Sequence, residues 1–418
     1  MRRRSTAVLA AVLVAASVAV VPGAPALAAR TDGVRDAEYW LDEYGIRTAW
    51  NTTRGAGVTI AVIDTGVDGS VPELQGAVVS GADFSGFGSP DGQTPVGPAE
   101  ESDHGTMVSS LAAGRGTGGE NGVIGSAPAA TILPLSIGFG EGSTTSDDQI
   151  AAAVRYATDA GADVINMSLT RNTLEWPTSW DDAFLYAMEH DVVIVAAAGN
   201  RGSGTTQVGA PATMPGVLTV AGVDANGQAS FDASSQGITI GVSAPSEGLV
   251  GVTPGGSHVL WNGTSGATPI VAGIVALVRA AHPDLDAANV IERVVATARD
   301  AGAQGTDPIY GFGLIDATAA VTASVPLVTE NPMGDLADWI TVYRRATSTS
   351  TPSPTVAPVP VPEQVVAGPV NPLGTLLPTV NLLRSVGIPF GVLVLFGATL
   401  VFAVVSAVRR VRRARQTR

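Results

Sequence analysis

Four separated positions in the chain carry side chains that a nucleophilic hydrolase needs, namely Asp64, His104, Asn200 and Ser265. A serine hydroxyl is a poor nucleophile at neutral pH, so it needs an imidazole to accept its proton. The imidazole needs a carboxylate to hold its tautomer and to stabilise the imidazolium. We therefore predict Ser265 as the nucleophile and His104 as its base. Asp64 would orient the histidine, and the Asn200 amide would donate to the oxyanion.

Each of these residues alone also has an ordinary structural explanation. An Asp after an apolar run often caps a helix or forms a turn, and Gly199-Asn200 is typical of a turn. A serine before an apolar helix is most often an N-cap. The other histidines, at positions 190, 258 and 282, lie in no comparable motif. A catalytic role is favoured because all four residue types that the chemistry needs occur together.

The elements that must position these residues alternate between strands and helices. Short β-branched apolar runs predict strands at residues 58–63, 131–137, 164–169, 192–197 and 217–223. Helices are predicted in between, notably at 149–160 and 181–190. This alternation predicts an α/β fold, with a parallel sheet covered by helices on both faces. Functional residues gather at the carboxyl ends of such strands, where Asp64 and Asn200 fall.

Ser265 lies in a glycine-rich approach to an apolar helix predicted at residues 270–281, with Pro269 in its first turn. The N-terminus of a helix favours negative charge, because its first N–H groups lack partners within the helix. A developing oxyanion beside Ser265 would be stabilised there.

These motifs resemble those of the subtilisin family of serine proteases. The matching signatures are Asp64-Thr65-Gly66, His104-Gly105-Thr106, Gly199-Asn200, Gly263-Thr264-Ser265, Ala210-Pro211-Ala212, Ala244-Pro245 and the run from Tyr310 to Asp316. The order Asp, His, Ser is that of subtilisin, and the match covers residues 40–325. The resemblance implies a subtilisin-like sheet and peptide-bond hydrolysis through an acyl-enzyme. It also implies that Ser168, Leu169 and Thr170 form an edge strand that pairs with extended substrate.

Three residues depart from the family pattern, and one of them, Ser246 after Ala244-Pro245, has no consequence that follows from the sequence. Gly266 stands where a bulky residue usually follows the nucleophile, so we expect looser packing behind Ser265. Thr170 stands where glycine is frequent, which leaves the depth of the specificity pocket open. Neither change removes a group that the chemistry needs.

Both ends of the chain predict export and anchoring. Residues 1–28 have a basic start, an apolar run and small residues before position 29, as in a secretory signal peptide. The alternative is an uncleaved anchor. Residues 386–408 are uncharged, and their apolar core of 21 residues makes about 31 Å of helix, enough to cross a membrane. The basic tail, 409–418, predicts a cytoplasmic C-terminus, with the body outside the cell membrane in a single-pass topology.

Residues 346–385 connect body and membrane and are rich in proline at their start. This composition favours an extended, semi-rigid stalk, although a disordered linker is the alternative. The predicted domains are therefore a peptidase domain at 29–345 with a short N-terminal extension, the stalk, the transmembrane helix and the tail. Loop 85–102, rich in Gly and Pro, is expected to cover part of the cleft.

Composition excludes several function classes. The 418 residues include no cysteine, which excludes disulfides, thiolate metal sites and a cysteine nucleophile. Residues 29–385 hold 14 arginines against 37 acidic residues, a net charge of −23, so a nucleic-acid partner is disfavoured. We predict no cofactor and no metal site, and calcium is left open because no compact Asp/Asn loop is visible.

The short N-terminal extension, the stalk and the Arg-flanked C-terminal span together resemble the mycosins. These are membrane-anchored subtilases associated with type VII secretion, many of which carry cysteine pairs that this chain lacks. The resemblance implies protein or peptide substrates and type VII membrane components as partners. The leading hypothesis is thus a membrane-anchored extracytoplasmic serine endopeptidase. The alternative is a scaffold that stabilises the secretion channel, with proteolysis secondary.

Overall fold

The computed structural model describes residues 33–98, 101–139 and 144–344 of the chain. The predicted signal peptide, stalk, transmembrane helix and basic tail lie outside the described residues.

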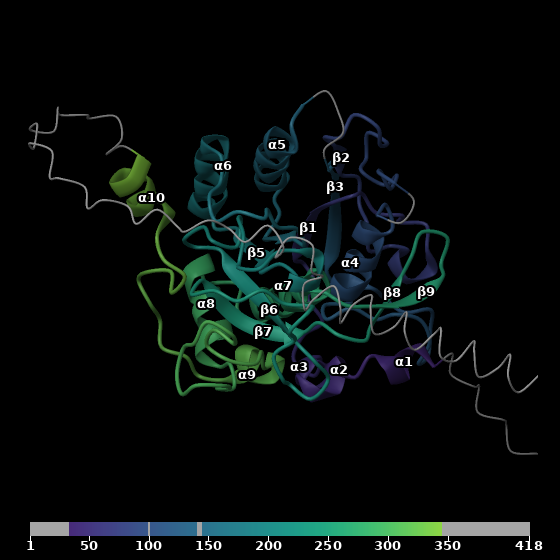
Figure 1. The fold of residues 1–418 in the computed structure, drawn as a ribbon. Coiled ribbons are helices and arrows are strands. Elements are labelled where there is room, and N and C mark those ends of the chain that lie inside the picture. The colour runs from purple at the N-terminus through teal and green to yellow at the C-terminus, as the bar shows by residue number, and fades with distance from the viewer. Residues whose placement is uncertain (1–32, 99–100, 140–143, 345–418) are drawn as a thin grey trace, which may run out of the picture. The chain divides into compact units, whose positions relative to one another are not determined.

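A seven-stranded parallel sheet forms the centre of the body, with strand order β2-β3-β1-β4-β5-β6-β7 (Figure 1). The strands are β1 (Thr59–Asp64), β2 (Ala82–Asp83), β3 (Thr131–Ser136), β4 (Val164–Met167), β5 (Val193–Ala197), β6 (Leu218–Val223) and β7 (Ile240–Pro245). All five strands predicted from the sequence are present, each within two residues of its expected ends. Two strands are not predicted by the apolar pattern: β2, which has only two residues, and β7, whose apolar run is interrupted by Gly241.

Helices cover both faces of this sheet, as predicted. Figure 1 shows α5 (Ser146–Asp159) and α6 (Thr178–Glu189) above the sheet, and α8 (Ala287–Ala296) and α9 (Ala317–Thr322) toward the lower left. Helix α7 (Thr264–Ala281) lies at the centre of the view. Alternate residues of β1 face the two sides: Ile60 and Val62 join the core with α4 (His104–Ala113) and α7, whereas Ala61 and Ile63 join the core with α5 and α6. Burial on both faces explains why the strands are continuous apolar runs.

Helix α7 runs through the middle of the body. It begins at Thr264 rather than at residue 270, so Pro269 lies in its second turn and not in its first. Among the described residues, α7 is the one helix long and apolar enough to cross a membrane, but 78% of it is buried within the body. It is therefore the core helix of a globular domain.

The short N-terminal extension is part of the core. It forms α1 (Val34–Ala37), α2 (Trp40–Glu43) and α3 (Ile46–Ala49), and Trp40 and Leu41 are completely buried. The buried Glu38 carboxylate accepts a hydrogen bond from the main-chain nitrogen of Ile124 at 2.8 Å. This contact ties the extension to the segment that follows α4.

Smaller elements complete the body. They are the antiparallel hairpin of β8 (Leu249–Val252) and β9 (His258–Trp261), α10 (Leu336–Trp339), the turns η1 (Pro72–Leu74) and η2 (Arg201–Ser203), and the π-helical turn η3 (Ile340–Arg344). The hairpin packs against α4, and α10 packs against α6. The ring of Trp339 lies 4.4 Å from that of Trp176, so the last described residues fold back onto the body.

Candidate active site

The fold brings the sequence-predicted residues to one edge of the sheet. Asp64 is the last residue of β1, and Asn200 follows β5. His104 is the first residue of α4, and Ser265 is the second residue of α7. The carboxyl ends of parallel strands lie along the same edge, and both helices begin there.

Asp64 and His104 form a direct hydrogen-bonded pair. The imidazole Nδ1 lies 2.9 Å from Oδ1 and 3.0 Å from Oδ2 of the carboxylate. Asp64 is fully buried, and its Oδ1 also accepts from the main-chain nitrogen of Thr65 at 2.8 Å. Because the carboxylate accepts, the proton of a neutral His104 is assigned to Nδ1, which leaves Nε2 as the basic nitrogen.

This environment raises the pKa of His104 above its ordinary value. Burial lowers the pKa, but the negative charge of Asp64 and its hydrogen bond raise it by more. The imidazolium is thus stabilised at a position where 28% of the side chain is exposed to the cleft. A base that holds a proton more readily is suited to accept one from a hydroxyl.

Gly105 allows α4 to begin so close to β1. A Cβ atom on Gly105 would lie 2.2 Å from the carbonyl oxygen of Gly66, so no side chain fits there. The main-chain nitrogen of Gly105 also donates to the Thr65 hydroxyl at 3.0 Å. These contacts account for the motifs Asp64-Thr65-Gly66 and His104-Gly105-Thr106.

Ser265 and Ser168 hold each other through two hydrogen bonds. The Ser265 hydroxyl donates to the carbonyl oxygen of Ser168 at 3.0 Å, and the Ser168 hydroxyl donates to the carbonyl oxygen of Ser265 at 2.8 Å. Pro269 has no N–H, so the Ser265 carbonyl four residues earlier has no helical donor, and Ser168 takes that place. Within the described residues, no hydrogen bond joins Ser265 to His104, although both side chains line the same cleft.

The orientation of the Asn200 amide is set by Thr264. The Asn200 Oδ1 accepts from the main-chain nitrogen of Thr264 at 2.8 Å and from its hydroxyl at 2.9 Å. With Oδ1 occupied by donors, Nδ2 is turned the other way and lies 3.0 Å from where a Cβ on Gly263 would be. The amide hydrogens are thereby presented beside the start of α7.

A cleft of about 350 Å³ lies beside His104 and Ser265. It is lined by Thr65, Glu101, His104, Met107, Phe139, Ser168, Leu169, Thr170 and Ser265. The residues predicted to bind substrate, Ser168 to Thr170, are therefore at its wall. They lie beyond β4, which ends at Met167, so the predicted strand at 164–169 was two residues too long.

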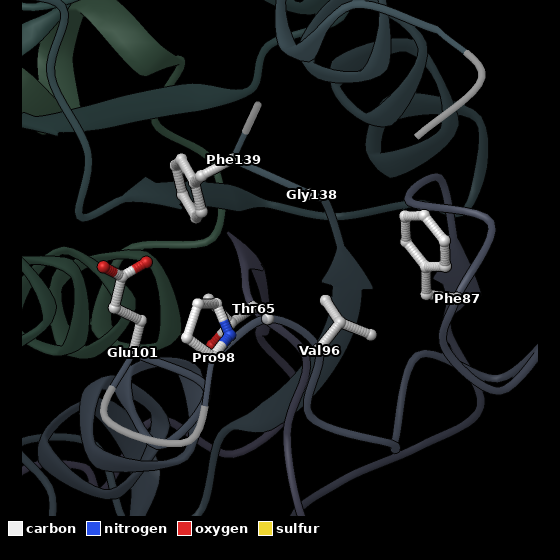
Figure 2. Close-up of a pocket in the computed structure, with 8 residues that line it drawn as sticks. Thr65, Phe87, Val96, Pro98, Glu101, Gly138 and Phe139 are labelled. Atoms are coloured by element: carbon white, nitrogen blue, oxygen red, sulfur yellow. The ribbon is translucent and has the colours of Figure 1, made fainter. Parts of the chain in front are cut away.

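A small pocket adjoins this cleft (Figure 2). Its walls are Thr65, Phe87, Val96, Gly97, Pro98, Glu101, Gly138 and Phe139. Loop 85–102, expected to cover part of the cleft, supplies five of these residues. The carboxylate of Asp83 anchors this loop by accepting hydrogen bonds from the hydroxyls of Ser136 and Ser85 and from main-chain nitrogens.

The β8–β9 hairpin also supports the site, although no motif in the sequence led us to expect it. A Cβ on Gly266 would lie 2.3 Å from Leu249 and 3.2 Å from the ring of Trp261, so the space behind Ser265 is filled. The expectation of loose packing was therefore wrong. An aromatic residue four positions before Ser265, together with a glycine just after it, was the signal in the sequence.

The described segments contain no group of three or more His, Asp or Glu side chains that could hold a metal ion.

Comparison with known proteins identifies the family. The sequence profile of the subtilase family matches residues 55–313, which is more than half of the chain. The chain belongs to the subtilase family. The resemblance seen in the sequence motifs and the predicted α/β fold are both confirmed.

Several relatives of this subtilase are mycosins. Mycosin-3 of Mycobacterium tuberculosis is 34% identical over 337 residues, covering 66% of this chain and 70% of the relative. Fervidolysin of Fervidobacterium pennivorans is 33% identical over 320 residues, which is 69% of this chain but only 44% of the relative. The subtilase also spans 64% of a thermophilic serine proteinase from a Bacillus strain, at 37% identity. The chain therefore spans less than two thirds of some of its curated relatives.

Solved structures agree with these relationships. The MycP3 protease from the type VII (ESX-3) secretion system superimposes with a TM-score of 0.58 at 32% identity, covering 68% of this subtilase and 88% of that chain. MycP1 from Mycobacterium smegmatis superimposes with a TM-score of 0.58 at 31% identity, and the match covers 69% of this subtilase and 85% of MycP1.

Proposed function

We propose that this subtilase hydrolyses peptide bonds in proteins through an acyl-enzyme, with Asp64, His104 and Ser265 as the catalytic triad and Asn200 as the oxyanion donor. The observation that carries the proposal is the hydrogen-bonded pair of Asp64 and His104 at a cleft that also holds Ser265. The buried carboxylate, the imidazole and the hydroxyl are the three groups that the chemistry needs.

The first half of the reaction forms the acyl-enzyme. The Ser265 hydroxyl leaves the carbonyl oxygen of Ser168 and donates to Nε2 of His104, which removes the proton as the oxygen attacks the substrate carbonyl. Asp64 stabilises the imidazolium that results. The substrate oxygen becomes an oxyanion, to which Nδ2 of Asn200 donates and which the start of α7 stabilises through its dipole.

The second half releases the products. The imidazolium gives its proton to the leaving amine, so the peptide bond breaks and the acyl group stays on Ser265. Water then loses a proton to His104 and attacks the ester. Collapse of the second oxyanion frees the carboxylic acid, and the imidazolium returns the proton to the Ser265 oxygen. Ser168, Leu169 and Thr170 are proposed to hold the extended substrate along the wall of the cleft.

Labelling with a fluorophosphonate tests this proposal, because only an activated serine reacts. The full chain in detergent should be labelled, and Ser265→Ala and His104→Ala should abolish labelling. Ser203→Ala, a serine on the exposed turn η2, is the matched control and should label like the wild type. Labelling that persists in Ser265→Ala would contradict the assignment of the nucleophile.

We also propose that the protein acts at the outer side of the cell membrane, with type VII secretion components as partners. The support is the similarity to Mycosin-3 and to solved structures described as parts of type VII systems, together with the apolar span and basic tail of the sequence. The body should be inaccessible to protease added on the cytoplasmic side. A scaffold role for the same chain is the second candidate, supported by the same similarity.

Comparing Ser265→Ala with a deletion strain separates the two roles. The substitution removes one hydroxyl and little surface, so it should abolish cleavage and leave the secretion complex assembled. The deletion should impair assembly or export as well, measured by native gels of membrane extracts and by assay of exported proteins. Intact assembly and export in the deletion strain would exclude the scaffold role and leave a processing protease.

A further inference from the structure

Glu101 places a negative charge in the cleft. Of the described residues that line the cleft, Glu101 and His104 are the two that can carry charge, and the others are neutral. Glu101 is exposed and lies three residues before His104, directly ahead of α4. A substrate that fills the cleft therefore meets one accessible carboxylate close to the reaction centre.

The backbone of Glu101 is held in place while its carboxylate is left to solvent. Its main-chain nitrogen donates to the carbonyl oxygen of Pro98 at 2.9 Å, and its carbonyl oxygen accepts from the nitrogen of His104 at 3.1 Å. Asp83 and Asp91 in the same region instead use their carboxylates to accept hydrogen bonds from the loop. Hydrogen bonding within the loop therefore does not explain why residue 101 carries a carboxylate.

The surroundings of Glu101 suit a long side chain with an apolar stem and a cationic end. Glu101 lines both the cleft and the adjoining pocket, and it shares both with Thr65 and Phe139. Figure 2 shows its carboxylate extending into the space below Phe139, with Pro98 to one side. Lysine and arginine can lay their methylene groups along such apolar walls while the charged group reaches an acid.

We propose that Glu101 selects substrates that carry a lysine or arginine shortly before the scissile bond. The position is on the acyl side because the residues proposed to pair with that part of the substrate, Ser168 to Thr170, line the same cleft. This inference rests on the proposed peptidase function. The proposed substrates are basic segments of proteins, which one ion pair and apolar contacts hold beside the reaction centre.

The test compares matched peptides that carry Lys or Gln at each of the four positions before the scissile bond. The full chain in detergent should prefer Lys at one position by roughly fivefold to tenfold in kcat/KM at low salt, the range expected for an ion pair that binding partly desolvates. Added salt should reduce the preference. Glu101→Gln should remove it, and Glu101→Lys should favour a Glu-containing peptide at the same position.

A control separates Glu101 from the general acidity of the body. Asp182→Asn removes an equal charge from an exposed position on α6, away from the cleft, and should keep the preference for Lys. Absence of a charge preference at every position, or a preference that survives Glu101→Gln, would overturn the inference.

A binding measurement distinguishes failure of the Glu101 inference from failure of the peptidase assignment. Fluorescent Lys and Gln peptides would be titrated onto Ser265→Ala, with and without Glu101→Gln, and followed by anisotropy. Tighter binding of the Lys peptide that depends on Glu101 supports the inference even without turnover. A protein that reacts with fluorophosphonate but binds both peptides equally retains the peptidase function and loses the inference.

Discussion

The indole ring of Trp261 lies edge-on to the imidazole of His104, with ring centroids 5.8 Å apart and planes inclined at 76°. Trp261 is paired with Leu249 across the β8–β9 hairpin, and the same two side chains pack where a side chain on residue 266 would lie. A hairpin without a proposed catalytic residue thus supports both the base and the residue after the nucleophile.

Trp261→Ala is expected to lower kcat/KM about tenfold, because an edge-to-face pair contributes roughly 0.5–1.5 kcal/mol and its loss also opens a cavity beside His104. Trp261→Phe should restore most of the activity. The matched control is Leu260→Ala, since Leu260 is the neighbouring residue of β9 and is 69% exposed. Equal effects of Trp261→Ala and Leu260→Ala on peptide hydrolysis would show that the ring contact does not support catalysis.

Ser168→Ala should lower the free energy of unfolding by about 0.5–1.5 kcal/mol, because the partly buried carbonyl of Ser265 loses its donor. Pro269→Ala returns an N–H that can donate to the same carbonyl. The double variant should therefore lose less stability than the sum of the two single variants. Thermal unfolding of all four proteins measures this coupling, and strictly additive effects would refute it.

Asn200→Ala should lower kcat by roughly 10²–10³ with little change in KM, the loss recorded when subtilisin loses one oxyanion donor. The amide is oriented by Thr264, whose main-chain nitrogen and hydroxyl both donate to its Oδ1. Asn226→Ala, at an exposed turn, is the control and should keep full activity. A rate within twofold of the wild type would remove Asn200 from the site.

The pH dependence of kcat/KM should follow His104. The base must be neutral to accept the serine proton, so activity should rise with pH through a midpoint above the ordinary histidine pKa of about 6.5. The raised pKa also stabilises the fold fully below the unfolded-state pKa, and this contribution is lost as pH rises through the folded-state pKa. Asp64→Asn should move the midpoint of any residual activity downward, and an unmoved midpoint would assign the titration to another group.

The sequence by itself determined the α/β class and the residues of the candidate site. Both are local signals: buried parallel strands must be continuous apolar runs, and a helix can begin beside another backbone only where glycine stands, as at Gly105. The carboxyl ends of parallel strands share an edge, so Asp64 and Asn200 could be placed together without knowing the strand order.

Only the tertiary structure decided how those residues are held. The Ser265 carbonyl accepts from Ser168, which is 97 residues distant, and this contact lets α7 begin five residues before Pro269. Trp261 and Leu249 fill the space beside Gly266 because the β8–β9 hairpin pairs them. No periodic pattern of apolar residues in the sequence predicts such a contact. Packing between distant segments depends on shape and on which donors remain unpaired after folding, and these properties exist only once the chain has folded.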